Sequence, residues 1–224
     1  MNSCIVDHNT FYKAFEGMNG KDNIYDKLGD CCLDYMKRDV TRDIESLLTH
    51  LGIDWRHDPS MKDTPERVAR MYIEVMRGRL TPEPKVTDFP NTMKLDQMYC
   101  VGPVDIRSMC SHHLVPVMGK AWFGVILDQK SNILGLSKFG RIADWIFARP
   151  HMQEEATAML ADKLEEICKP RGLALIVRAS HGCTTWRGLK AEGSQMITSE
   201  MRGAFRDNPA SREEFMAHIK GLGY

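Results

Sequence analysis

The spacing of apolar residues predicts helices in the first part of the chain. Apolar side chains recur at helical spacing over residues 40–51, and Gly52 follows as a stop signal. A second helix is predicted to begin with Thr64 as its N-cap and Pro65 in its first turn, and to end at Gly78. Helices therefore precede any sheet in this chain.

Periodicity is weak over residues 1–36, which also contain several turn-forming residues. We expect a variable extension over these residues, then a helical region over residues 37–95. The end of that region, residues 79–95, contains three prolines and is predicted to be a connecting loop. A separate domain is expected over residues 96–224.

The apolar pattern changes from helical to extended in this last part. Short runs rich in β-branched and aromatic residues predict strands over residues 99–108, 120–127, 173–180 and 195–199. A helical stretch over 138–169 lies between them, and Pro150 should divide it near Ala148. A closing helix has Ser211 as its expected cap and Glu214 completing a capping box. This order predicts an α+β fold, with helices on one face of an antiparallel sheet.

Composition and charge exclude several classes of protein. The 43% of hydrophobic residues is enough for a core, and 30 basic residues balance 30 acidic ones, so nothing indicates nucleic acid or an anionic membrane as a partner. No apolar run approaches the roughly 20 residues that span a bilayer, and the N-terminus lacks the features of a signal peptide. The seven scattered cysteines fit a reducing compartment, so a cytoplasmic location is expected.

Two short stretches, "MCSHHLVP" and "SHGC", combine cysteine with histidine. Cys110 and His113 have a common ligand spacing, and His181 and Cys183 would share one face of an extended segment. Thiolate and imidazole are the donors that zinc prefers. The alternative is two buried apolar thiols with surface histidines. Two such clusters, each at the end of a strand, favour the metal site.

Two further stretches combine charged or polar groups with a predicted helix start. "GLSKFGR" places Ser137, Lys138 and Arg141 at a predicted helix start, where anions are favoured, and Arg187 is a further cation. The alternative is a solvated helix start. In "RPHMQEEATAML", Glu154 is either an acid stabilised by the helix dipole or a carboxylate that accepts hydrogen bonds from guanine. Local reasoning leaves both alternatives open.

Six motifs in order resemble the GTP cyclohydrolase I family: "DTPERVARMY", "MCSHHLVPVMGKA", "GLSKFGRIADW", "RPHMQEEAT", "SHGCTTWRG" and "TSEMRGAF". The resemblance runs from about residue 40 to the C-terminus. It implies a tunnelling fold, in which a four-stranded antiparallel sheet carries two helices on one face and is preceded by N-terminal helices. It also implies a catalytic domain over residues 96–224 and a toroidal homo-oligomer, a decamer in the family.

The resemblance also implies roles for individual residues. Zinc would be held by Cys110, His113 and Cys183, with water in the fourth position, and His112 and His181 would be catalytic residues outside the ligand set. Two groups of residues would bind GTP, one at the triphosphate and one at the guanine base. The triphosphate would contact Ser137, Lys138, Arg141 and Arg187, with Arg67 reaching a phosphate from a neighbouring subunit. Guanine would be held by Gln153 and Glu154.

The implied reaction is hydrolysis of GTP at C8, with release of formate and formation of 7,8-dihydroneopterin triphosphate. His181 is the expected acid for purine N7, because histidine titrates near neutral pH. Folate, tetrahydropterin and deazaguanine routes share this step. Many family members have Glu where this chain has Ser111, which puts the surroundings of the zinc in question. The alternatives are an inactive zinc-stabilised assembly module of the same fold and a nitrile reductase of deazaguanine synthesis, which would need a nucleophilic cysteine and no zinc triad.

Overall fold

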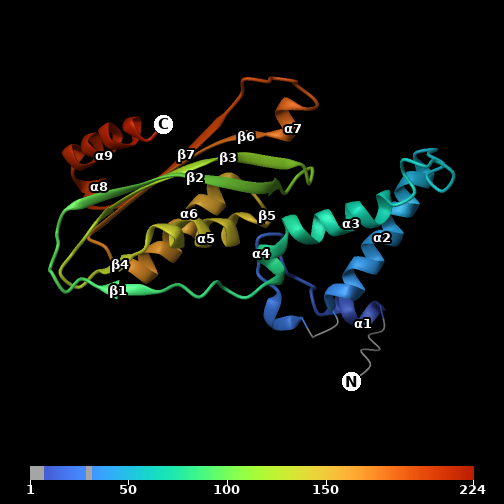
Figure 1. Ribbon diagram of the computed structural model, residues 1–224, viewed down its shortest axis with the longest axis horizontal. Helices are drawn as coiled ribbons and strands as arrows, with labels where there is room; N and C mark the ends of the chain where they lie inside the picture. Colours follow the sequence, from blue (N-terminus) through green and yellow to red (C-terminus); the bar gives the residue numbers. More distant parts are fainter. Residues whose placement is uncertain (1–7, 29–31) are drawn as a thin grey trace. The chain divides into compact units, whose positions relative to one another are not determined.

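The computed structural model describes residues 8–28 and 32–224. The chain divides into two compact units, Met1–Pro82 and Glu83–Tyr224 (Figure 1). Within the described residues, no helix is both long enough and apolar enough to cross a membrane.

The first unit is helical. Its elements are α1 (His8–Lys13), the 3-10 helix η1 (Tyr25–Lys27), α2 (Cys32–His50), α3 (Thr64–Val75) and α4 (Arg77–Leu80). The helix predicted over residues 40–51 is confirmed as the second half of α2, which begins earlier than expected. Residues 1–7 and 29–31 of the predicted extension lie outside the described residues.

The ends of α3 differ from the prediction. Its N-cap is Asp63 and not Thr64, which is already helical, while Pro65 occupies the first turn as expected. The Asp63 carboxylate makes no capping bond and accepts a hydrogen bond from Arg67 instead. Gly78 does not end the helix, because α3 stops at Val75 and Gly78 lies within α4.

The second unit is built on a five-stranded sheet of order β5-β2-β3-β6-β7. All four long strands are antiparallel to their neighbours, and the two-residue β5 pairs in parallel with β2. The strands are β2 (Met98–Cys110), β3 (Pro116–Ile126), β5 (Pro150–His151), β6 (Gly172–His181) and β7 (Met196–Gly203). A separate pair, β1 (Asp88–Pro90) and β4 (Asn132–Leu134), places a strand within the segment predicted to be a loop over residues 79–95.

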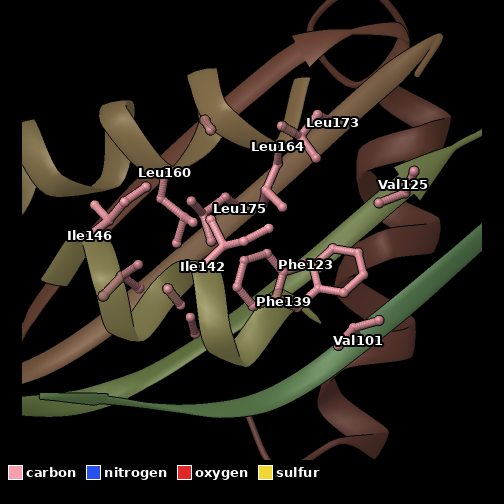
Figure 2. Packing of buried hydrophobic residues seen from close by; sticks show 14 of the residues in the cluster. Val101, Phe123, Val125, Phe139, Ile142, Ile146, Leu160, Leu164, Leu173 and Leu175 are labelled. Carbon is pink, nitrogen blue, oxygen red and sulfur yellow. The ribbon is translucent and has the colours of Figure 1, made fainter. Parts of the chain in front are cut away.

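Two helices, α5 (Leu136–Phe147) and α6 (Gln153–Cys168), cover one face of the sheet. Figure 2 shows Phe139 of α5 and Leu164 of α6 packed with Phe123 and Leu175 of the strands, and all four side chains are fully buried. The division at Pro150 is confirmed: α5 ends at Phe147, and β5 separates it from α6. The predicted α+β class is therefore correct for this unit.

The two expected helices on one face are joined by a helical layer on the other face, which was not predicted. The short helix α8 (Ala204–Asp207) and α9 (Pro209–Gly221) place Phe205 and Phe215 against Trp122 on the opposite face. Alternate residues of a strand point to opposite faces, so β3 buries both faces where Trp122 and Phe123 follow each other. Gly124 makes this possible, because a Cβ there would lie 2.7 Å from the Phe215 ring.

The cap of α9 is Asn208, whose side chain accepts a hydrogen bond from the Ala210 amide. The predicted cap, Ser211, lies inside the helix because α9 begins earlier, at Pro209. Proline suits a first helical position, since the amide hydrogen that it lacks would have no partner there.

We predict that Leu164→Ala lowers the free energy of unfolding by about 2–5 kcal/mol, because it removes a fully buried side chain from a packed core. The matched control is Leu189→Ala, which truncates a leucine that is 79% exposed and should change stability by less than about 0.5 kcal/mol. Urea unfolding followed by circular dichroism measures both. Equal losses in the two variants would contradict the placement of the core.

Candidate metal and active site

Strand β3 brings two distant parts of the sequence together. Its first residues pair on one side with the end of β2 (Pro116 with Met109) and on the other with the end of β6 (Val117 with His181). The short helix α7 (Gly182–Thr185) follows β6 directly. Figure 1 shows α7 at the same end of the sheet as the turn between β2 and β3.

Three side chains that could hold a metal ion meet at this end. One ligand atom from each of Cys110, His113 and Cys183 lies within 4.8 Å of the other two. The turn folds His113 back toward Cys110, because the Cys110 amide donates to the Val115 carbonyl at 2.9 Å and the Leu114 amide donates to the Cys110 carbonyl at 2.9 Å. Leu114 adopts the left-handed conformation, with φ of 52°, that this tight turn requires.

Cys183 reaches the cluster by a different route from the one predicted. His181 and Cys183 were expected to share a face of an extended segment, but β6 ends at His181 and Cys183 lies in α7. The backbone passes close to β3 here, since a Cβ on Gly182 would lie 3.0 Å from the Pro116 carbonyl oxygen. The change from strand to helix therefore turns Cys183 toward Cys110.

The donor set fits zinc. Cys110 is buried, Cys183 is half-buried and His113 is exposed, so the cluster lies at the surface with one open side. Two sulfurs and one imidazole nitrogen are zinc donors, and three protein ligands are the number that leaves a position for water. Elsewhere among the described cysteines, burial raises the pKa of the Cys100 thiol to about 11 and that of the Cys168 thiol to about 12, which disfavours the thiolate that binds a metal.

The two histidines predicted to be catalytic, His112 and His181, lie in the same region as the triad. Nδ1 of His112 is 3.9 Å from the Cys110 sulfur, and the ring is exposed in the turn. His181 is half-buried, and its Nε2 lies 2.8 Å from Oε1 of Gln153. Loss of hydration lowers the pKa of His181, while the negative charge of Glu154 opposes this shift. His181 therefore lies against the start of α6, and His112 lies beside Cys110.

Gln153 and Glu154 begin α6, but they occupy different environments. Gln153 is 4% exposed, and its side-chain nitrogen lies within hydrogen-bonding distance of the carbonyls of Val177 and Met196 and of the Thr198 hydroxyl. Glu154 is exposed. Of these two residues, Glu154 is the one that presents its side chain to solvent.

Sequence reasoning missed three residues of this region. The hydroxyl of Thr157 bonds the Gln153 carbonyl at 2.7 Å and the Thr198 hydroxyl at 2.7 Å. Thr157 follows Gln153 by four residues, and helical residues four apart are neighbours, so the sequence could have indicated this contact. No local pattern indicates Thr198 on β7. His151 is buried and is paired with Cys110 in the β2–β5 ladder, and a two-residue strand has no periodicity to detect.

The predicted triphosphate residues lie on elements other than those that carry the triad. Ser137, Lys138 and Arg141 lie in the first half of α5, which leads from β4 to β5 (Figure 1). The end of α5 approaches Cys110 through β5, and ten residues (147 − 137), about 15 Å of helix, separate Ser137 from that end. Arg187 is exposed just after α7, on the triad's side. Arg67 is exposed on α3, in the first unit.

Comparison with known proteins defines the family. The family model described as GTP cyclohydrolase I matches residues 40–220. The chain belongs to the GTP cyclohydrolase I family. All the predicted site residues lie within the matched range.

Three relatives are named GTP cyclohydrolase 1. The protein of Halalkalibacterium halodurans is 40% identical over 81% of this chain and 96% of its own length. The protein of Carboxydothermus hydrogenoformans is 39% identical over 79% of this chain and 91% of its own length. The protein of Bacillus subtilis is 36% identical over 82% of this chain and 96% of its own length. The solved archaeosine synthase QueF-Like, in its apo form, shares 14% identity at a TM-score of 0.39 over 47% of this chain and 93% of that one, which is too distant to carry an argument.

We predict that Cys183→Ser reduces bound zinc from about one ion per chain to less than a tenth, because it removes one of only three protein ligands. Cys100→Ser is the matched control and should keep its zinc, since Cys100 lies ten residues before Cys110 on β2, about 33 Å away along the strand. Elemental analysis of the purified proteins measures both. Full zinc content in Cys183→Ser would contradict the ligand set.

Proposed function

We propose that this chain is a zinc-dependent GTP cyclohydrolase I, which hydrolyses GTP at C8, releases formate and yields 7,8-dihydroneopterin triphosphate. One observation carries the proposal: in a chain of this family, Cys110, His113 and Cys183 converge within 4.8 Å beside His181. The thiols require a reducing compartment, which is the basis for the proposed cytoplasmic location.

Cys110, His113 and Cys183 would hold the zinc ion. When bound, zinc lowers the pKa of a coordinated water to about 7 and so supplies a nucleophile for hydrolysis. The two thiolates offset the charge of the ion, and their apolar neighbours Val117 and Ala179 exclude water from the buried side of the site. The hydrolysis would therefore take place on the exposed side of the site, where His113 lies.

Protons are moved by His181 and His112 in this proposal. His181 would hold a proton at purine N7, which makes C8 electrophilic, and His112 would serve the later steps of ring opening. Glu154 would accept hydrogen bonds from the N–H edge of guanine. Adenine lacks that edge and would leave the carboxylate without donors, which gives a mechanism for its rejection.

The triphosphate is proposed to bind Arg187 of the same chain as the zinc, and Ser137, Lys138 and Arg141 of another chain. Their position in the first half of α5, about 15 Å of helix before the end that leads to β5, supports this division. The first turn of α5 offers unpaired amides and a positive dipole end to a phosphate. Arg67 would reach a phosphate from a further subunit.

A homo-oligomer with a tunnelling fold completes the proposal. Within the described residues, β7 pairs only with β6, and the outer edge of β2 pairs only with the two residues of β5. Exposed strand edges are templates for pairing with another chain, which supports a ring of subunits, proposed to be a decamer. GTP is the proposed partner, and neither nucleic acid nor a membrane is included. The inactive assembly module gains no support, since the triad and both histidines are present.

We predict that the purified protein, incubated with GTP, releases formate and forms a product that oxidises to a fluorescent pterin. His181→Ala should abolish formate release, because the proton donor is lost, while elemental analysis shows zinc still bound. Loss of zinc in this variant would make His181 a ligand instead. Absence of formate from the zinc-loaded wild-type protein would contradict the proposed function and favour the inactive module.

We predict that active sites are shared between chains. Lys138→Ala should lower kcat/KM by about 10- to 100-fold, the effect of removing one charged hydrogen bond, and Cys183→Ser should be inactive. Co-expressed with different tags and purified as mixed oligomers, the two variants should regain activity, because a Cys183→Ser chain lends its Lys138 to an intact triad. No recovery in mixed oligomers would place all these residues in one chain's site.

A further inference from the structure

We propose that Gln153 is a positioning residue that fixes the hydrogen-bonding state of His181, so that Nε2 of the ring carries a hydrogen and Nδ1 is left to face the substrate. The expected effect on catalysis rests on the proposed function. The assignment of the hydrogen to Nε2 of His181 rests on hydrogen-bond geometry alone. It assigns Gln153 a task that acts through His181 and does not require contact with guanine.

The orientation of the Gln153 amide is determined by its neighbours. Its Nε2 lies 3.1 Å from the Val177 carbonyl oxygen and 3.3 Å from that of Met196. Carbonyl oxygens only accept hydrogen bonds, so the –NH₂ end of the amide must face them. The oxygen, Oε1, therefore faces His181, at 2.8 Å.

The orientation of the amide determines the state of the ring. An amide oxygen also only accepts, so the hydrogen between it and His181 must reside on Nε2 of the imidazole. In the neutral ring the hydrogen is then absent from Nδ1, which is the nitrogen that gains and loses the exchanged proton: it donates to the substrate from the doubly protonated ring and accepts in the neutral one. Without Gln153, both tautomers would be open to His181.

Two threonines hold Gln153 in place. Thr157 donates its hydroxyl hydrogen to the Gln153 carbonyl, so toward Thr198 it can only accept. Thr198 therefore donates to Thr157 and accepts from Nε2 of Gln153, at 3.0 Å. Every bond in this chain has one consistent direction, and Gln153 is anchored to α6, β6 and β7 at once.

The same bonds separate the roles of Gln153 and Glu154. The oxygen of the Gln153 amide is taken by His181, and its two N–H hydrogens have three acceptors in the protein. The side chain is 4% exposed, so it has neither a spare group nor an open path for guanine. Glu154, the exposed neighbour, is left as the carboxylate that selects the base.

Two readouts test the proposal. In wild-type protein labelled with ¹⁵N-histidine, loaded with zinc and free of GTP, solid-state NMR at about pH 8, where a histidine ring is neutral, should show His181 with a protonated Nε2 and an unprotonated Nδ1. The signals are assigned by their absence from His181→Ala. Gln153→Met, which keeps length but removes both hydrogen-bonding ends, should lose this single tautomer and lower kcat by about 10- to 100-fold with KM within about twofold.

Two comparison variants sharpen the result. Glu154→Ala should raise KM and leave the His181 tautomer unchanged. Thr198→Val should lower kcat less than Gln153→Met does, because the Val177 and Met196 carbonyls still orient the Gln153 amide. If Gln153→Met fails to fold, Thr198→Val tests the same hydrogen-bond network. A wild-type ring protonated on Nδ1 would overturn the proposal, as would a Gln153→Met variant that raises KM at unchanged kcat. The expected tautomer in a protein inactive on GTP would overturn the proposed function and leave the positioning role intact.

Discussion

The pairing of β3 with two neighbours at once is the constraint on which the site depends. The end of β2 and the end of β6 are seventy residues apart in sequence, and the first residues of β3 hold both. Backbone hydrogen bonds fix this register, and a slip of one residue would turn His181 away from α6. The buried strands and the helices that cover them keep the slip from occurring. Cys110, His113 and Cys183 therefore offer their donor atoms from backbone positions that the sheet and its core have fixed.

Local patterns predicted the elements that have one buried face. The division of the helical stretch at Pro150 and the strands around it follow from periodicity and from proline geometry. The second buried face of β3 was not predicted, because a continuous apolar run such as "AWFGVI" has no period from which its two partners can be identified. The aromatic residues of α8 and α9 show what covers that face. Long-range packing of this kind is absent from any short window of sequence.

The candidate site was predictable in its chemistry and not in its geometry. Cys110 and His113 were recognisable from spacing, and the turn of the hairpin explains why that spacing works. Cys183 was identified for a wrong structural reason, since α7 and not an extended strand directs it to the triad. The residues of α5 were identified by residue type, and no local pattern relates them to the cluster of Cys110, His113 and Cys183. The spacing of residues in the sequence identifies possible donor side chains. The register of the sheet determines which of these side chains lie close together.

Gln153 and Glu154 show how adjacent residues come to divide one task. Successive residues of a helix point about 100° apart, so a helix that packs on a sheet can bury one and expose the next. The start of α6 buries the uncharged amide, where its donors and acceptor can all be satisfied, and leaves the carboxylate exposed and hydrated. The reverse order would bury a charge beside the carbonyls of β6 and β7, which only accept hydrogen bonds, at a cost of several kcal/mol. The order of these two residues is thus set by the desolvation of charge as much as by the chemistry that each performs.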